Sequence, residues 1–246
     1  MSQVAVTDVQ RVLRIFESFS IQQTPLSLTE LAHATDTPKS TCHAIVNTLV
    51  MEGYLYTLRS PRTMYPTKRI WEISQRINAT DPIAQRLLPL LEQVRDQTKE
   101  TVILGKRQGD VALYLQIVES RNAIRYIANP GDFKPLHSSA IGKALLSALP
   151  EAELRTVLKR VVLKRATPNT ITTVAALRRN LEDAAQRGYA MTSGENVADV
   201  SAVAIPLNLG IESFALAVAG PTHRIHQAVP VILKALSSVR DEMAPA

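Results

Sequence analysis

A tight turn between two short helix-forming segments constrains the first part of this chain most strongly. Ser27 and Glu30 form the pattern of a capping box, in which each side chain accepts a hydrogen bond from the other residue's backbone N–H. The helix that starts there ends at Thr35-Asp36-Thr37, whose Asp is one of the few non-glycine residues that tolerate a left-handed backbone. We expect Thr37 to cap a second helix with Pro38 at its first position, where the missing N–H costs nothing.

This second helix is predicted to run to about Glu52 and to stop at Gly53. An earlier helix has an apolar face between Val9 and Phe19, and two short strands are expected at 54–56 and 63–65, joined by a loop over 58–62. The inward face of the second helix carries Cys42, Ile45, Val46 and Leu49. Three short helices followed by a hairpin are typical of a winged helix-turn-helix, which we therefore predict for residues 1–66.

The outer face of the second helix carries polar side chains that suit DNA. In a helix-turn-helix the second helix enters the major groove, which is wide enough for one helix. The candidate DNA-binding residues lie at the N-terminal end of this helix and along its outer face, and all but Pro38 are of types that contact phosphates or base edges. They are Pro38, Lys39, Ser40, Thr41, His43 and Asn47. A solvated helix face would explain the same residues. Arg59 and Arg62 in the hairpin favour DNA, because a wing uses arginines to grip the neighbouring backbone.

The net charge supports a polyanionic partner only through its local distribution. The formal charge is +6, of which residues 1–80 hold 8 basic and 6 acidic side chains and residues 81–246 hold 20 and 16. The excess is therefore not concentrated in the first domain. In contrast, Arg59, Arg62, Lys68 and Arg69 lie in a short stretch without Asp or Glu, and such a stretch can neutralise phosphates.

The rest of the chain predicts a second domain built on a sheet. Residues 67–80 form a polar helical connector closed by Asp81-Pro82, so we expect a linker helix at 67–81 and a domain at 82–246. Helical segments are predicted at 83–97, 138–188 and 222–241. Strands are predicted in two groups of three, at 101–106, 111–118 and 123–128 and at 189–192, 201–207 and 213–219. Short connections within each group predict a mixed, largely antiparallel sheet flanked by helices, and hence an α+β fold.

Motifs spread over nearly the whole chain resemble those of one known family. They are Leu26-Ser27-Leu28-Thr29-Glu30-Leu31-Ala32, Pro38-Lys39-Ser40-Thr41, Gly53-Tyr54-Leu55, Pro135-Leu136-His137-Ser138-Ser139-Ala140-Ile141-Gly142-Lys143-Ala144, Arg187-Gly188-Tyr189-Ala190, Glu195, Ala204-Ile205-Pro206 and Gly220-Pro221. In this order they resemble the isocitrate lyase regulator (IclR) family of bacterial transcription factors. Two positions depart from the family pattern. Asp36 stands where Gly is usual, which the backbone tolerance of Asp makes harmless, and Ala44 stands where Arg usually follows the recognition-helix His, so no operator sequence carries over.

The resemblance implies a GAF-like second domain that binds a small organic effector. It also implies a homodimer or tetramer that binds a palindromic operator in double-stranded DNA, as a repressor or an activator. Effector-lining positions carry over to Ser138, Ser139, Ala140, Ile141, Thr192, Val200, Ala202, Ala217 and Ala219. Most of these residues are small and apolar, so an aromatic or otherwise partly apolar acid is favoured, because an unpaired polar ligand atom costs about 1–3 kcal/mol.

A carboxylate on such an effector has several candidate partners. Backbone N–H groups where the segment Pro135 to Ala144 opens a helix are suited to an anion, although a simple helix cap would explain the same polar residues. Arg125 and Lys134 are further candidates, with ordinary surface charge as the alternative.

Enzyme and scaffold functions are the competing interpretations. His137 and Ser138 are adjacent, and adjacent helical residues do not face each other as a nucleophile and its base must. Glu195 and Asp199 are candidate paired carboxylates or solvated loop charges, and His223 and His226 lack an evident third metal ligand. We therefore expect no catalytic site, metal or cofactor. A DNA-binding scaffold whose second domain only dimerises remains open.

Composition indicates the compartment. Cys42 is the chain's one cysteine, which fits a reducing cytoplasm because it cannot form an intramolecular disulfide. No apolar stretch approaches the roughly 18–20 residues that span a bilayer, and the polar stretch from Met1 to Val12 does not resemble a secretory signal. We expect a cytoplasmic protein with no membrane partner.

Overall fold

The computed structural model describes residues 7–59 and 62–243, and of residues 82–85 only the backbone. Residues 60 and 61 of the expected hairpin loop lie outside the described residues, as do residues 1–6 and 244–246. The chain divides into two compact units, Met1–Asp81 and Pro82–Ala246.

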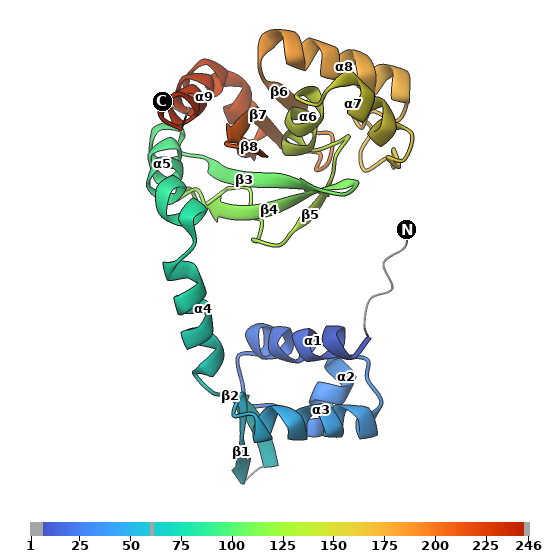
Figure 1. The fold of residues 1–246 in the computed structure, drawn as a ribbon, viewed down its shortest axis with the longest axis vertical. Helices are drawn as coiled ribbons and strands as arrows, with labels where there is room; N and C mark the ends of the chain where they lie inside the picture. Colours follow the sequence, from blue (N-terminus) through green and yellow to red (C-terminus); the bar gives the residue numbers. More distant parts are fainter. Residues whose placement is uncertain (1–6, 60–61, 244–246) are drawn as a thin grey trace. The chain divides into compact units, whose positions relative to one another are not determined.

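The first unit consists of helices and one two-stranded sheet (Figure 1). Its elements are α1 (Thr7–Gln22), α2 (Leu28–Ala34), α3 (Lys39–Met51), β1 (Leu55–Arg59), β2 (Arg62–Pro66) and α4 (Arg69–Ala79). The strands β1 and β2 pair antiparallel, and a bridge between Leu26 and Met64 ties the hairpin to the start of α2. The hydrophobic core under α3 contains Ile15, Phe19, Leu31, Cys42, Val46, Leu49 and Leu55.

Local chemistry sets the geometry of the helix-turn-helix. The capping box at α2 is present, with the Ser27 N–H donating to the Glu30 carboxylate at 2.7 Å and the Glu30 N–H donating to the Ser27 hydroxyl at 3.3 Å. Asp36 has a φ of 49°, so the expectation of a left-handed turn is confirmed. The expectation for the cap of α3 is wrong by one residue. Pro38 is the N-cap, and the Thr37 hydroxyl donates instead to the Thr35 carbonyl.

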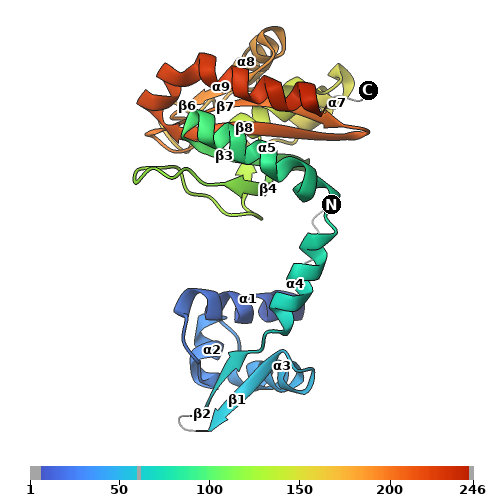
Figure 2. The same ribbon diagram turned by 90° about the vertical axis from the view of Figure 1, so that its left-hand side faces the viewer.

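The second unit is a six-stranded sheet with helices on both faces (Figure 1, Figure 2). The strand order is β5-β4-β3-β8-β7-β6, and every neighbouring pair is antiparallel. Its elements are α5 (Pro82–Thr98), β3 (Thr101–Gln108), β4 (Val111–Val118), β5 (Phe133–Pro135), α6 (Ala140–Ser147), α7 (Glu151–Leu158), α8 (Val174–Arg187), β6 (Ala190–Ser193), β7 (Val200–Leu209), β8 (Glu212–Pro221) and α9 (Thr222–Glu242). The predicted α+β class is confirmed.

Alternation along β8 decides which helices cover which face. Phe214, Leu216 and Val218 lie on one side of the strand and pack in the core that includes α5 and α9. Ala215, Ala217 and Ala219 lie on the other side, in the core that includes α6, α7 and α8. Because alanines leave room where larger residues would fill the space, the face under α6 is the one on which a cavity can form.

Two predictions for the second unit need correction. Residues 123–128 are not a strand. The Thr101 hydroxyl and the Arg224 guanidinium donate to the carbonyls of Tyr126 and Ile124, so side chains bind this backbone where a strand would pair with its neighbour. The third strand on this edge of the sheet is β5, which contains Pro135, a residue that edge strands tolerate. The predicted helical block 138–188 consists of α6, α7 and α8 with an irregular segment over 159–173.

Candidate functional site

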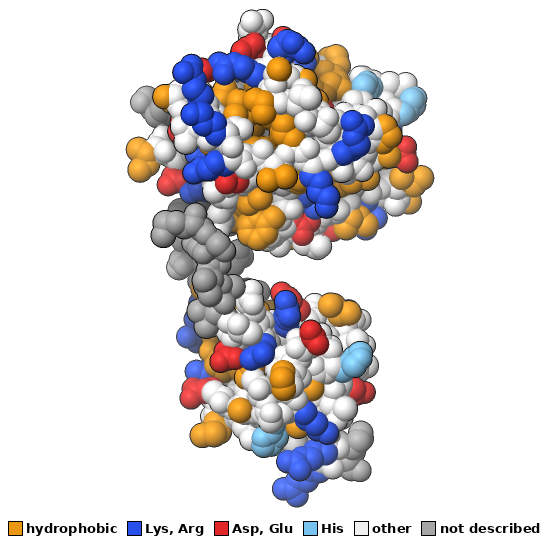
Figure 3. Space-filling view, turned by 90° about the vertical axis from the view of Figure 1, so that its right-hand side faces the viewer, with side chains coloured by type: hydrophobic (Ala, Val, Ile, Leu, Met, Phe, Trp, Pro, Cys, Tyr) orange, Lys and Arg blue, Asp and Glu red, His pale blue; other side chains and the backbone are white. Residues whose placement is uncertain are grey.

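The outer face of α3 presents most of the residues predicted to contact DNA. Lys39, Ser40, His43 and Asn47 are exposed, as is Pro38 at the N-cap, while Thr41 is half-buried. Arg59 and Arg62 are exposed at the ends of β1 and β2 that face the loop. Figure 3 shows Lys and Arg side chains gathered at the lower end of the first unit. A surface groove between α2, α3 and the hairpin is lined by Ser27, Leu28, Thr29, Lys39, His43, Val46, Asn47, Val50, Thr57, Arg62 and Met64. The fold thus brings Lys39, His43, Asn47 and Arg62 together.

Two of these side chains also contact each other. The Asn47 amide nitrogen lies 3.3 Å from the nearer ring nitrogen of His43, one helical turn away. The pair therefore presents a single polar surface, and replacing either residue changes the environment of the other. Arg69, from the basic stretch over residues 59–69, makes its contacts within the first unit, because its guanidinium donates to the Glu52 carbonyl and stacks over Tyr54.

A cavity in the second unit lies between the start of α6 and the central strands. Its walls are Ile103, Tyr114, Tyr126, Ser138, Ser139, Ala140, Ile141, Thr192, Asn196, Val197, Val200, Ala202, Ala217 and Ala219. All nine residues predicted to line an effector site are among them. The cavity volume is about 30 Å³, room for only two or three water molecules.

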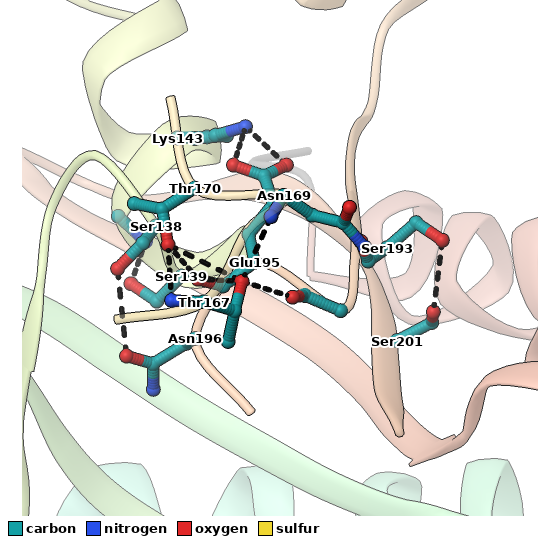
Figure 4. Close-up of polar contacts among 12 residues, drawn as sticks. Ser138, Ser139, Lys143, Thr167, Asn169, Thr170, Ser193, Glu195, Asn196 and Ser201 are labelled. Carbon is teal, nitrogen blue, oxygen red and sulfur yellow. Dashed lines mark hydrogen bonds and ion pairs between the residues drawn. The ribbon is translucent and has the colours of Figure 1, made fainter. Parts of the chain in front are cut away.

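Polar groups gather at the α6 end of this cavity (Figure 4). The Ser139 hydroxyl already has two hydrogen-bond partners within the chain, since it accepts from the Gly142 N–H at 3.2 Å and donates to the Pro135 carbonyl at 2.6 Å. The Ser138 hydroxyl donates to the Asn196 side chain at 3.4 Å. The backbone N–H groups of Ala140 and Ile141, in the first turn, have no intrahelical carbonyl to bind. This end of the cavity can therefore receive an anionic or hydrogen-bond-accepting group.

Comparison with known proteins decides the family. The model of the bacterial transcriptional regulator IclR C-terminal domain matches residues 76–242, and that of the IclR helix-turn-helix domain matches residues 9–59. The chain belongs to the IclR family. It is similar to the HTH-type transcriptional regulator BhcR of Paracoccus denitrificans, with 31% identity over 89% of this chain and 79% of that protein. The chain is therefore a transcriptional regulator with a DNA-binding helix-turn-helix domain.

Solved IclR structures have the same fold. The Thermotoga maritima IclR matches with a TM-score of 0.78 and 25% identity, covering 96% of this chain and 98% of that one. An IclR homologue from Microbacterium hydrocarbonoxydans, solved in complex with 4-hydroxybenzoate, matches with a TM-score of 0.75 and 26% identity over the same shares of the two chains.

Five cavity residues were missed at the level of sequence. They are Ile103, Tyr114, Tyr126, Asn196 and Val197. Tyr114 had a detectable signal, because alternation along β4 places it on the same face as Ala112, toward α6. Its side chain is buried, which raises the pKa of the phenol, and hydrogen bonding with Tyr126 raises it further, so the hydroxyl stays protonated. Tyr126 lies in the segment wrongly predicted as a strand.

Three charged residues of the second domain that were candidates for binding a carboxylate or for catalysis form ion pairs within the domain. Arg125 and Lys134 do not line the cavity and pair with Glu119 and Asp132. The Lys134 ammonium also lies 5.7 Å from the ring centroid of Tyr114, a cavity residue. Glu195 is not a solvated loop charge. It is buried and binds Lys143 of α6 through both carboxylate oxygens, at 2.6 and 2.7 Å.

Asp199 and the two helical histidines complete this group. Asp199 is exposed, and its carbonyl accepts from the Thr222 N–H. His226 contacts the Ser193 hydroxyl at 2.9 Å and His223 contacts Gln227 at 3.1 Å. Among residues 7–59 and 62–243, no group of three His, Cys, Asp or Glu residues is arranged to hold a metal ion. Within the same residues, no helix has the length and hydrophobicity needed to cross a membrane.

His137 has a structural role that gives a pH-dependent prediction. It is 1% exposed, its Nε2 lies 3.1 Å from the Lys164 carbonyl, and its Nδ1 is buried without a hydrogen-bond partner. Burial, helped by the nearby Lys143 ammonium, lowers the pKa of His137 below the usual 6.5 and outweighs the bond to Lys164. The unfolded chain therefore binds a proton that the folded chain rejects. The stabilising contribution of neutral His137 is complete above pH 6.5 and is lost as the pH falls through the lower, folded pKa.

We expect the stability gap between the parent and His137→Gln to narrow from pH 7 to pH 5. The substitution removes the titrating ring and keeps an amide that can donate to the Lys164 carbonyl. Urea unfolding of both proteins at the two pH values measures this gap. A gap that stayed constant would mean that His137 keeps an ordinary pKa when buried.

Proposed function

We propose that this regulator binds a palindromic operator as a homodimer and that a small, partly apolar organic acid in its second unit changes operator affinity. In this proposal residues 1–66 are the DNA-binding domain, 67–81 a linker helix and 82–246 the effector-binding domain. The observation that carries the proposal is the convergence of nine positions, chosen by resemblance, on the one cavity that begins at the start of α6.

The dimer is supported by apolar side chains that the first unit leaves in water. Val9 and Leu13 on α1, and Trp71 and Ile77 on α4, are all more than half exposed. Apolar surface of this kind, on helices otherwise rich in polar residues, suits a second copy of the chain. A two-fold symmetric protein would read a two-fold symmetric site.

The chemistry of the cavity supports the effector class. Its alanines, valines and Ile103 exclude a ligand that is polar all round, and the tyrosines offer ring faces and hydroxyl groups. The free N–H groups of Ala140 and Ile141 suit a carboxylate at one end. The Microbacterium hydrocarbonoxydans homologue, complexed with the aromatic acid 4-hydroxybenzoate, supports the same class for this chain.

Thermal-shift screening of aromatic and aliphatic acids, followed by operator-binding assays with each hit, tests the proposal. An acid that raises the midpoint and changes operator affinity supports an effector-responsive regulator. Binding of the operator with no response to any acid would favour a scaffold, and consumption of a hit would revive an enzymatic function.

We expect Arg62→Ala and Asn47→Ala to weaken operator binding in different ways. Arg62 would neutralise a phosphate, so its loss should weaken all sequences alike and reduce the steepness of the salt dependence by about one released ion. Asn47 would contact a base edge, so its loss should cost about 1–3 kcal/mol at particular positions. Binding to a library of operator variants at several salt concentrations separates the two effects. A specificity change from Arg62→Ala, with none from Asn47→Ala, would reverse the assignment.

A further inference from the structure

A buried ion pair lies behind the cavity and joins its two walls (Figure 4). Lys143 is fully buried on α6, two residues beyond the cavity residue Ile141, and its ammonium donates to both carboxylate oxygens of Glu195. Glu195 directly precedes Asn196 and Val197, which form part of the opposite wall. The pair therefore connects the α6 wall to the segment between β6 and β7.

That segment is a compact loop. The Gly194 N–H donates to the Val200 carbonyl at 2.9 Å, and the Val200 N–H donates to the Val197 carbonyl at 3.1 Å. Gly194 has a φ of 62°, and a Cβ there would lie 2.4 Å from the Ala198 carbonyl oxygen. These two hydrogen bonds close the loop from Gly194 to Val200 on itself. We name it the 194–200 loop.

Three neighbouring segments hold the 194–200 loop in place, and one of them, the start of α9, donates the Thr222 N–H to the Asp199 carbonyl at 2.9 Å. The segment between α7 and α8 binds its first carbonyls, with the Thr167 hydroxyl donating to Gly194 at 2.6 Å and the Thr170 hydroxyl donating to Glu195 at 2.6 Å. These bonds fix the loop's base. The contacts to α6 and the residues just before it are the Lys143–Glu195 pair and the long hydrogen bond from Ser138 to Asn196.

Stability alone does not account for a charged pair in this position. A buried ion pair is often no more stabilising than apolar residues of the same volume, because both charges lose their hydration. Unlike apolar contacts, however, the ion pair is directional, because two short charge-assisted hydrogen bonds fix the position of the carboxylate relative to the ammonium. The cavity it backs is also too small to accept an organic acid unless a wall moves.

We propose that the Lys143–Glu195 pair is a positioning device that holds the 194–200 loop against α6 and so controls how readily a molecule enters and leaves the cavity. The identity of that molecule as an effector rests on the proposed function, but the effect of the pair on loop opening does not.

A thiol inside the cavity gives a test that needs no effector. Ala219→Cys places a thiol on the cavity wall, and peptide mass spectrometry follows its modification by methyl methanethiosulfonate in the full-length protein. Cys42, buried in the first unit, is an internal reference for reagent dose and for opening of that unit. We expect Glu195→Gln to speed modification of the introduced thiol roughly tenfold, because loop opening then separates no ion pair. Modification of Cys42 should not change.

The double variant Lys143→Met/Glu195→Leu is decisive, because it replaces the pair with apolar residues that can keep the unit folded. It should retain the parent's thermal midpoint and still show the faster modification. Lys106→Met/Glu212→Leu removes an exposed ion pair from the same unit, away from the cavity, and should leave the rate unchanged. A double variant that reacts at the parent's rate, or a control that reacts equally fast, would overturn the proposal.

Calorimetry with 4-hydroxybenzoate separates this inference from the proposed function. If the parent binds the acid in calorimetry, stopped-flow measurements should show both faster association and faster dissociation for Glu195→Gln. If the parent binds neither this acid nor any in the panel, the effector class is wrong, while the labelling rates still decide what the ion pair does.

Discussion

Gly142→Ala should strongly destabilise the second unit. A Cβ at this position would lie 2.4 Å from the Leu136 Cα and 2.5 Å from the Leu136 carbonyl oxygen. Both are backbone atoms, and Leu136 is fully buried, so neither side can yield without displacing α6 or the segment before it. We expect a loss of about 3 kcal/mol or more in the free energy of unfolding.

Peptide-level hydrogen exchange under increasing denaturant measures this loss for each unit separately. Gly109→Ala is the matched control, because its φ of 61° strains an alanine while nothing lies within 4 Å of the added Cβ. Backbone strain alone should cost about 1–2 kcal/mol there. Equal losses at the two glycines would mean that α6 does not pack tightly against Leu136.

The first unit could be predicted well because its signals are local. The capping box joins Ser27 to Glu30, three residues apart. Asp36 adopts a left-handed backbone conformation because the Asp side chain itself tolerates it. The one-residue error at Pro38 shows the limit of such reasoning. Thr37 can cap α3 only if its hydroxyl is free, and that hydroxyl is used by the turn before the helix.

The sheet of the second unit was predictable where apolar and small residues alternate, as they do along β8. The failure at residues 123–128 has a different origin. Ile124 and Tyr126 have the apolar pattern of a strand, but their carbonyls accept from Arg224 and Thr101, which are 100 and 25 residues distant. A pattern within a segment does not indicate such distant donors.

The site was predicted in part for related reasons. Resemblance identified wall positions at the start of α6 and on the strands, including Val200, but not the tyrosines or Asn196 and Val197. The ion pair behind the cavity did have a signal. Lys143 is the one charged residue in the otherwise apolar stretch from Ala140 to Leu146, and a charge on a fully buried helix requires a partner. Its partner is 52 residues away, so sequence alone could not identify Glu195.

Ala217→Leu and Ala219→Leu should abolish the response to the effector while operator binding persists. Both alanines lie on the sheet wall of the cavity, whose volume of about 30 Å³ leaves no space for three added carbon atoms beside a ligand. Overpacking should cost about 1–3 kcal/mol of stability, which leaves the unit folded. We expect effector affinity to fall roughly hundredfold or more, as it does when a ligand clashes with the wall of its pocket.

Calorimetry with the acid identified by the thermal-shift panel measures this loss, and operator binding with and without the acid measures the response. Ala215→Leu is the matched control, because Ala215 lies on the same face of β8 and in the same core but does not line the cavity. It should cost similar stability and keep the effector. Coupling between the two units is expected to be about 1–3 kcal/mol, so a variant that binds no effector should keep the operator affinity of the unliganded parent. If Ala217→Leu and Ala219→Leu both bound the acid as tightly as the parent, the effector site would lie elsewhere in the chain.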